Sequence, residues 1–183
     1  MTFQEKGKTG MNRCWTLGDN INTDDITPHQ YQGVTDLKEL AVHVFENLKP
    51  GFAAQLKQGD ILVCGDNFGY GSSRERAPQS LIGAGIEAII AKSFARIFYR
   101  NCINVGLPVI TCIEAVDHIV DGDDITLDID QGIIENVEKG AIYRFQPFPL
   151  FLQEILSSGG LIHSLNKKRE RNLVGGGRCN GSD

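Results

Sequence analysis

Three short apolar runs alternate with two segments of helical periodicity in the middle of this chain, and that alternation restricts the fold more than any other feature. The runs are Ile61-Leu62-Val63-Cys64, Ala88-Ile89-Ile90-Ala91 and a third that begins at Val109. Each run is too short for a helix and is typical of a buried strand. We expect helices over about 74–84 and 94–104. The resulting β-α-β-α-β order predicts a parallel sheet with right-handed crossover connections.

The flanking segments predict the rest of the domain. Beyond residue 120, apolar and polar residues alternate on both sides of Gln131-Gly132, which indicates a β-hairpin. The other expected elements are a strand over 14–17, a helix over 37–48 after an N-cap at Asp36, and an amphipathic helix over 148–156. We therefore predict an α/β domain over residues 14–166, in which helices flank a central, mostly parallel sheet and a hairpin is added. Residues 1–13 and the basic, glycine-rich residues 167–183 are expected to be flexible ends.

The composition is that of a globular protein and excludes several functional classes. Of the 183 residues, 41% are hydrophobic and 22% are charged, and the formal net charge is −5. Nucleic-acid binders usually carry a basic surface, so we expect no nucleic-acid partner. No apolar run approaches the ~20 residues that span a bilayer, and Met1 to Lys6 contain no apolar signal core. The sequence thus predicts a cytoplasmic protein that does not enter a membrane.

The cysteines argue against a disulfide framework and against a metal site within this chain. There are five of them, an odd number, and no two have the C-x-x-C spacing. We interpret them as buried thiols in a reducing compartment. Any iron–sulfur cluster that this protein uses must then be held largely by another chain. The four histidines, which we interpret as structural or surface residues, are His29, His43, His118 and His163.

The glycine-rich stretch after the first central strand is the best candidate for chemistry. It reads Gly65-Asp66-Asn67-Phe68-Gly69-Tyr70-Gly71-Ser72-Ser73-Arg74, and it should leave a strand, turn and enter a helix. Glycines let backbone N–H groups face outward, and a helix N-terminus adds partial positive charge. Two hydroxyls and a guanidinium follow, so the turn suits an anion, and Arg74 could bind a carboxylate through two hydrogen bonds.

Three well-known motifs do not fit this stretch. A Walker A loop requires Gly-Lys-Ser/Thr, and the stretch contains no lysine. A dinucleotide-binding turn requires G-x-G-x-x-G, but Arg74 stands where the third glycine belongs. A nucleophile elbow requires G-x-S-x-G, which Gly71-Ser72-Ser73 does not match. A helix capped by serine hydroxyls remains a purely structural alternative.

Two further segments carry weaker local signals. The first, Asn22-Thr23-Asp24-Asp25-Ile26-Thr27-Pro28, holds adjacent carboxylates, one of which could orient a reacting group. An Asx turn or a helix cap would use the same residues. The second, residues 92–101, carries aromatic and aliphatic residues at helical spacing, which are more typical of a core than of a cofactor site.

Together, the three segments resemble the small subunits of 3-isopropylmalate dehydratase, which are detached swivelling domains of the aconitase superfamily. The resemblance rests on Thr-Asp at 23–24, Gly-Ser-Ser-Arg-Glu at 71–75 and Lys-Ser-Phe-Ala-Arg at 92–96, and it extends over about 14–166. It implies a swivelling β/β/α fold and a large partner subunit that holds a [4Fe–4S] cluster. It also implies a hydro-lyase that isomerises a hydroxylated polycarboxylate by dehydration and rehydration.

The resemblance also implies roles for individual residues. Ser72 would be the catalytic base and Asp24 a catalytic aspartate, while Gly71, Ser73 and Arg74 would bind the substrate. Serine is not a base near neutral pH unaided, but an adjacent guanidinium and helix-end N–H groups would lower its pKa.

The position that selects the substrate in this family falls on Gly33, within Tyr31-Gln32-Gly33-Val34. Arginine there would favour a tricarboxylate, as in homoaconitase, whereas a small apolar residue would favour an isopropyl group. Glycine leaves 2-isopropylmalate, which is converted to 3-isopropylmalate in leucine biosynthesis, as the leading substrate. Homoaconitate, citraconate or methylmalate, and dimethylmalate stay open, as does a non-catalytic dicarboxylate-binding module.

Overall fold

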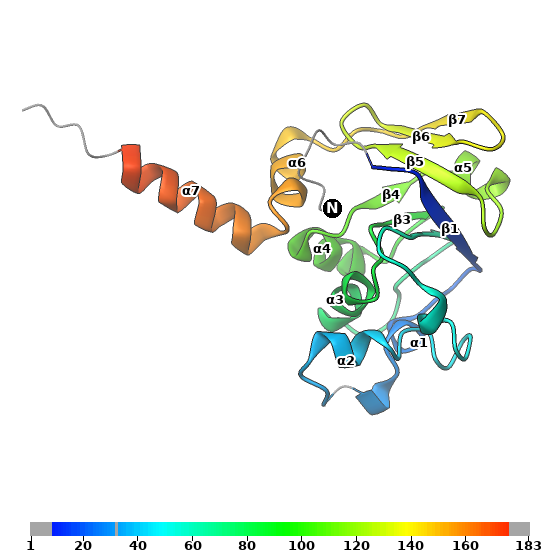
Figure 1. Ribbon diagram of the computed structural model, residues 1–183. Coiled ribbons are helices and arrows are strands. Elements are labelled where there is room, and N and C mark those ends of the chain that lie inside the picture. The colour runs from blue at the N-terminus through cyan, green and yellow to red at the C-terminus, as the bar shows by residue number, and fades with distance from the viewer. Residues whose placement is uncertain (1–8, 32, 176–183) are drawn as a thin grey trace, which may run out of the picture.

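The computed structural model describes residues 9–31 and 33–175, and a curled seven-stranded sheet forms its centre (Figure 1). The strands are β1 Asn12–Leu17, β2 Ile61–Cys64, β3 Ala88–Ala91, β4 Val109–Thr111, β5 Asp124–Asp128, β6 Ile133–Asn136 and β7 Ala141–Arg144. They lie in the order β4-β3-β2-β1-β5-β6-β7. Strands β1 to β4 pair in parallel, and β5 to β7 form an antiparallel extension of β1. The arrangement confirms the predicted α/β fold and the hairpin, and it adds β7, which the sequence did not indicate.

The parallel half of the sheet forms the core and aligns the segments that carry chemistry. Every residue of β2 and β3 is buried, as expected of strands covered on both faces. The last residues of the four strands, Leu17, Cys64, Ala91 and Thr111, pair in register. The four strands therefore end at one edge of the sheet, where open α/β sheets place their binding sites.

The helices cover the parallel strands and form most of the connections between them. They are α1 Thr23–Ile26, α2 Leu37–Ala41, α3 Arg76–Gly83, α4 Arg96–Val105, α5 Ile113–His118, α6 Leu150–Ser157 and α7 Leu161–Gly175, with short 3-10 turns η1 His29–Tyr31 and η2 Ala53–Gln55. Figure 1 shows α2, α3 and α4 stacked along one side of the sheet. The predicted helices at 74–84, 94–104 and 148–156 are thus confirmed, as α3, α4 and α6.

The helix predicted over 37–48 is wrong in its length. Asp36 does cap it, because its Oδ1 accepts a hydrogen bond from the Lys38 amide at 2.9 Å. However, α2 ends at Ala41. Phe45 has a φ of +58°, and its amide donates to Ile26 O at 3.1 Å instead of continuing the helix. The break lets the fully buried Phe45 ring meet Phe52, with ring centroids 5.7 Å apart.

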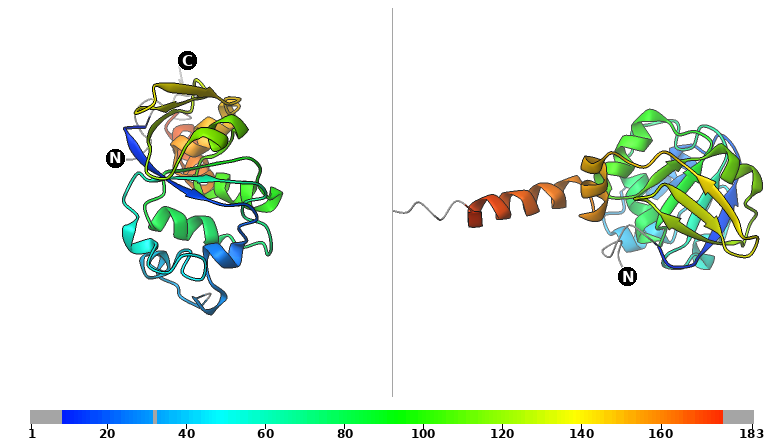
Figure 2. Two further views of the ribbon diagram at one scale, coloured as in Figure 1. Left: turned by 90° about the vertical axis from the view of Figure 1, so that its right-hand side faces the viewer. Right: turned by 90° about the horizontal axis from the view of Figure 1, so that it is seen from above.

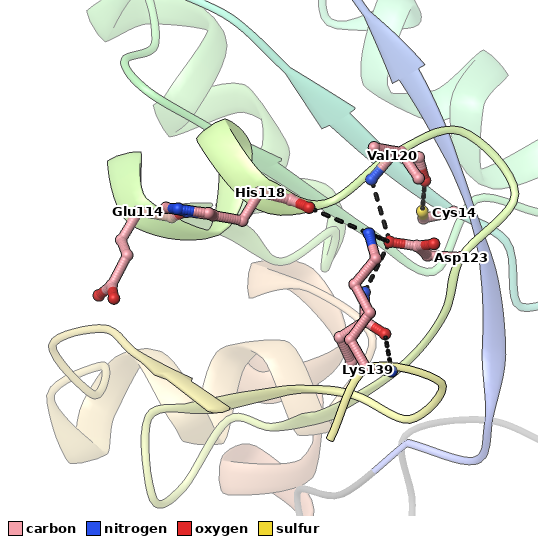
Figure 3. Close-up of polar contacts among 7 residues, drawn as sticks. Cys14, Glu114, His118, Val120, Asp123 and Lys139 are labelled. Carbon is pink, nitrogen blue, oxygen red and sulfur yellow. Dashed lines mark hydrogen bonds and ion pairs between the residues drawn. The ribbon is translucent and has the colours of Figure 1, made fainter. Parts of the chain in front are cut away.

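A buried polar cluster joins the antiparallel half to β1 (Figure 3). Asp123 Oδ2 accepts hydrogen bonds from Lys139 Nζ at 2.7 Å, Asn136 Nδ2 at 2.6 Å and Val120 N at 3.0 Å. Burial opposes ionisation of Asp123, but these three donors outweigh it and lower the pKa of the carboxyl. The Cys14 thiol of β1 donates to Val120 O at 3.1 Å. The 120–123 loop is thereby tied both to β1 and to the end of β6.

The structure describes parts of the two segments that were expected to be flexible ends. Thr9 donates its amide to Leu127 O at 2.8 Å, and residues 12–13 belong to β1. At the other end, α7 extends away from the rest of the chain (Figure 1, Figure 2), and its residues 165–171 are exposed. The remaining parts of both segments, 1–8 and 176–183, lie outside the described residues. Within 9–31 and 33–175, no helix is both long and apolar enough to cross a membrane.

Candidate functional site

The Ser72 turn, which we define as residues 65–75, joins β2 to α3 and packs against α4. Gly69 has a φ of +78°, and a Cβ there would lie 2.7 Å from the Cβ of Phe98 and closer still to two of its ring atoms. The turn therefore requires glycine at this position. The Phe68 amide donates to Ser93 O at 3.0 Å, and the Gly69 amide donates to Ile21 O at 2.7 Å. These contacts hold the backbone that carries Ser72.

The N-terminus of α1 lies directly beside the Ser72 turn. Asn22 caps α1 through a capping box with Asp25. The Thr23 amide donates to Tyr70 O at 2.9 Å. The buried Thr23 hydroxyl donates to Ser72 O at 3.2 Å and lies 3.4 Å from Ser72 Oγ. Two segments about fifty residues apart in sequence are thus joined at the Ser72 hydroxyl.

Arg74 is the fixed cation of the site. Its guanidinium forms an ion pair with Asp24 Oδ1 and donates to Thr27 O at 3.3 Å. The Arg74 side chain is only 16% exposed, whereas that of Asp24 is 50% exposed. Because this guanidinium is already held in one orientation, binding a carboxylate costs less side-chain conformational entropy than it would for a mobile surface arginine.

The residues around Arg74 form an open cavity of about 540 Å³. It is lined by Thr27, His29, Ser72, Ser73, Arg74, Glu75 and Arg76. Such a volume is within the range of small-molecule sites. Both serines are exposed, so a ligand has access to their hydroxyls. Three of the expected site residues, Ser72, Ser73 and Arg74, therefore share one cavity.

The other expected site residues, Asp24, Gly71 and Gly33, do not line this cavity. Asp24 reaches it through the ion pair with Arg74. Gly71, with a φ of +100°, precedes Ser72, and a Cβ there would lie 3.4 Å from Thr23 Oγ1. Gly33 is exposed, and a Cβ there would meet no atom within 4 Å.

Sequence reasoning missed three residues at this site. Thr23 was quoted within its motif but given no role, and His29 was interpreted only as a structural or surface residue. Arg76 was not singled out, although it lines the cavity and donates a hydrogen bond to Val34 O. No local pattern joins residues 23–34 to residues 72–76, because only the parallel pairing of β1 with β2 brings these segments together.

The described cysteines do not form a metal site. Cys14, Cys64, Cys102 and Cys112 are all buried free thiols. Burial raises the pKa of each, that of Cys14 to about 12, which disfavours the thiolate that a metal needs. Among the residues described, no three His, Cys, Asp or Glu side chains gather where they could hold a metal ion. Cys179 lies outside the described residues.

Comparison with known proteins places this chain in a family. The family model for the aconitase C-terminal domain matches residues 11–114. The 3-isopropylmalate dehydratase small subunit 1 of Archaeoglobus fulgidus is 52% identical over 161 residues, which cover 88% of this chain and 99% of that protein. The chain belongs to the 3-isopropylmalate dehydratase small-subunit family of the aconitase superfamily. The small subunit of Caldanaerobacter subterraneus is 54% identical over 151 residues, or 82% of this chain and 94% of that protein.

A solved structure confirms the fold class. The crystal structure of the 3-isopropylmalate dehydratase of Methanocaldococcus jannaschii matches with a TM-score of 0.85 at 41% identity, covering 90% of this chain and 98% of that one. The fold is therefore the aconitase-type swivelling domain that the three sequence segments predicted.

Proposed function

We propose that this chain is the small subunit of a hydro-lyase that isomerises an alkylmalate by dehydration and rehydration. The preferred reaction converts 2-isopropylmalate to 3-isopropylmalate in leucine biosynthesis, and it requires a large subunit. The observation that carries the proposal is the cavity shared by Ser72, Ser73 and Arg74 in a chain that covers 99% of a relative named for this reaction.

Arg74 binds one carboxylate of the substrate. The guanidinium is oriented by Asp24 and by Thr27 O, so it presents donors to the cavity in a fixed direction. Ser73 donates its hydroxyl to the bound acid, and the backbone of Gly71 lets the acid approach closely. Asp24 acts by keeping Arg74 in place.

Ser72 Oγ is the base. It takes a proton from the carbon next to the one that bears the hydroxyl, the C–H electron pair becomes the new C=C bond, and the hydroxyl leaves with the C–O electron pair as hydroxide. Ser72 then returns the proton to the other carbon of the double bond, while hydroxide adds to the carbon that was deprotonated. The nearby Arg74 charge and the Thr23 hydroxyl 3.4 Å away favour the alkoxide.

The large subunit completes the site. It would carry the [4Fe–4S] cluster, which supplies Lewis-acid assistance to the departing hydroxyl. Because the four described thiols are buried and held as protonated groups, this chain supplies the base and the carboxylate site, and the partner supplies the cluster.

The surroundings of Gly33 support an alkylmalate rather than a tricarboxylate. Glycine brings no cation for a third carboxylate, and the open space around it leaves room for an alkyl group. Homoaconitate, citraconate or methylmalate, and dimethylmalate are the alternative substrates that an assay must include.

Reconstitution with the large subunit tests the proposal. We expect the pair, but neither chain alone, to hydrate isopropylmaleate, the alkene that dehydration of 2-isopropylmalate produces. Ser72→Ala should abolish turnover while the two chains still assemble, whereas the neighbouring Ser73→Ala should mainly raise KM. If the pair turned over neither 2-isopropylmalate nor any of the alternative acids, but the lone chain bound a dicarboxylate tightly in a calorimeter, the non-catalytic module would be favoured instead.

A further inference from the structure

Arg76 connects the cavity to the segment that contains Gly33. It is the first residue of α3, it is half-buried, and it lines the same cavity as Ser72 and Arg74. Its Nη1 donates to the carbonyl oxygen of Val34. Val34 belongs to residues 33–36, here called the Gly33 segment, which lead into α2.

The far end of α3 holds the continuation of the same segment. A Cβ on Gly83, the last residue of α3, would lie 3.0 Å from Leu37 O and 3.2 Å from the Cβ of Ala41. The close approach at Gly83 fixes α2 against α3. Arg76 and Gly83 therefore hold residues 33–41 from the two ends of one helix.

The bond from Arg76 matters because most of the Gly33 segment is exposed, with only Val34 half-buried. Gly33 is exposed and has open space where a Cβ would stand. The Val34 amide donates to Tyr31 O at 3.1 Å, which joins the segment to η1, whose first residue His29 also lines the cavity. A hydrogen bond from a charged donor is about twice as strong as a neutral one, and the bond from Arg76 runs from the cavity wall itself.

We propose that Arg76 is a positioning residue that sets where the Gly33 segment stands at the rim of the cavity, and thereby which alkyl group of the substrate fits. The inference rests on the proposed function, since it assigns a source of selectivity to that site. Arg76 directly follows Arg74 and Glu75, so one short stretch both binds the carboxylate and fixes the distance to the alkyl-binding rim.

The test compares Arg76→Met and Arg76→Lys with Arg144→Met, which removes an exposed arginine from β7. Each variant is reconstituted with the large subunit and assayed on 2-isopropylmalate and on the shorter methylmalate. Loss of the tether raises the apparent dissociation constant, which equals the intrinsic constant divided by the fraction of molecules with the segment in place. For Arg76→Met we expect KM for 2-isopropylmalate to rise about tenfold, the scale of one charged hydrogen bond, with kcat within about twofold and a changed ratio of kcat/KM between the two acids. Arg76→Lys should restore part of this loss, and Arg144→Met should match the unmodified pair.

Hydrogen exchange on the lone chain gives a readout that does not depend on turnover. Amides of the peptide over 33–37 should exchange faster in Arg76→Met than in Arg144→Met. Unchanged exchange, or an unchanged substrate ratio, would overturn the inference. If Arg76→Met failed to fold, Arg76→Gln and Arg76→Lys would carry the same comparison. Absence of turnover on every acid by the unmodified pair would instead refute the proposed function, while the exchange result would still decide whether the tether exists.

Discussion

Replacing Gly69 by alanine should damage the Ser72 turn by forcing a methyl group into the Phe98 side chain. The new Cβ would lie 2.5 Å from Cδ1 and 2.7 Å from the Cβ of Phe98. Phe98 cannot withdraw easily, because it is 2% exposed and its ring meets that of Phe68 with centroids 5.4 Å apart. The backbone cannot withdraw either without breaking the bond from the Gly69 amide to Ile21 O.

Two costs add at this position. A residue with a Cβ in the left-handed region costs about 1–2 kcal/mol, and overpacking a filled core costs about 1–3 kcal/mol. We therefore expect Gly69→Ala to lower the free energy of unfolding by about 2–5 kcal/mol. Urea unfolding of the lone chain, followed by circular dichroism, measures this loss.

Gly18→Ala is the matched control, because a Cβ on Gly18 would meet no atom within 4 Å. It should unfold within about 0.5 kcal/mol of the unmodified chain. Adding Phe98→Leu to Gly69→Ala should recover part of the loss, since the two side chains compete for one space. Equal urea midpoints for Gly69→Ala and Gly18→Ala would show that Phe98 does not hold the turn.

Three further measurements follow from contacts described above. Asp123→Ala should destabilise the chain by about 2–4 kcal/mol, because it leaves buried donors such as Asn136 without an acceptor, whereas the exposed Asp121→Ala should cost less than 1 kcal/mol in the same urea titration. The lowered pKa of Asp123 stabilises the fold at pH values above about 4, the ordinary pKa of aspartate. This contribution is lost as the pH falls through the lower pKa of the folded state. If the stability of an Asp123→Asn chain fell between pH 6 and pH 3 by as much as that of the unmodified chain, this assignment would be contradicted. Thr23→Val should lower kcat by about two- to tenfold with little change in KM, because it removes the hydroxyl 3.4 Å from Ser72 Oγ, and single-turnover rates of the reconstituted pair would reveal whether the chemical step is affected.

The central strands were predictable from sequence because a strand buried on both faces has a continuous apolar sequence. The apolar runs at 61–64 and 88–91 coincide with β2 and β3, and no competing helical period is present in them. The expected helix over 37–48 failed because a long-range contact, from the Phe45 amide to Ile26, outweighs local periodicity. The basic charge run after residue 164 predicts an exposed segment but not its backbone conformation, and in the structure it forms α7 with residues 165–171 exposed.

The only part of the candidate site that was predictable is the part whose residues lie together in one sequence motif. Ser72, Ser73 and Arg74 stand together in the sequence and line one cavity in the structure. Arg76 and His29 also line this cavity. They are 47 residues apart (76 − 29), and no sequence motif contains both. Their proximity is a property of the sheet order, which places the ends of β1 and β2 side by side.

The position of β1 also governs how this protein can be assembled during synthesis. Among the described strands β1 comes first in the chain, yet it lies in the middle of the sheet, between β2 and β5. Its two edges cannot both be covered until residues near 125, which pair with Asn12, have emerged. Until then the nascent domain exposes an open strand edge, the kind of surface on which unfinished chains associate. Shortening the chain before β5 would make that temporary state permanent.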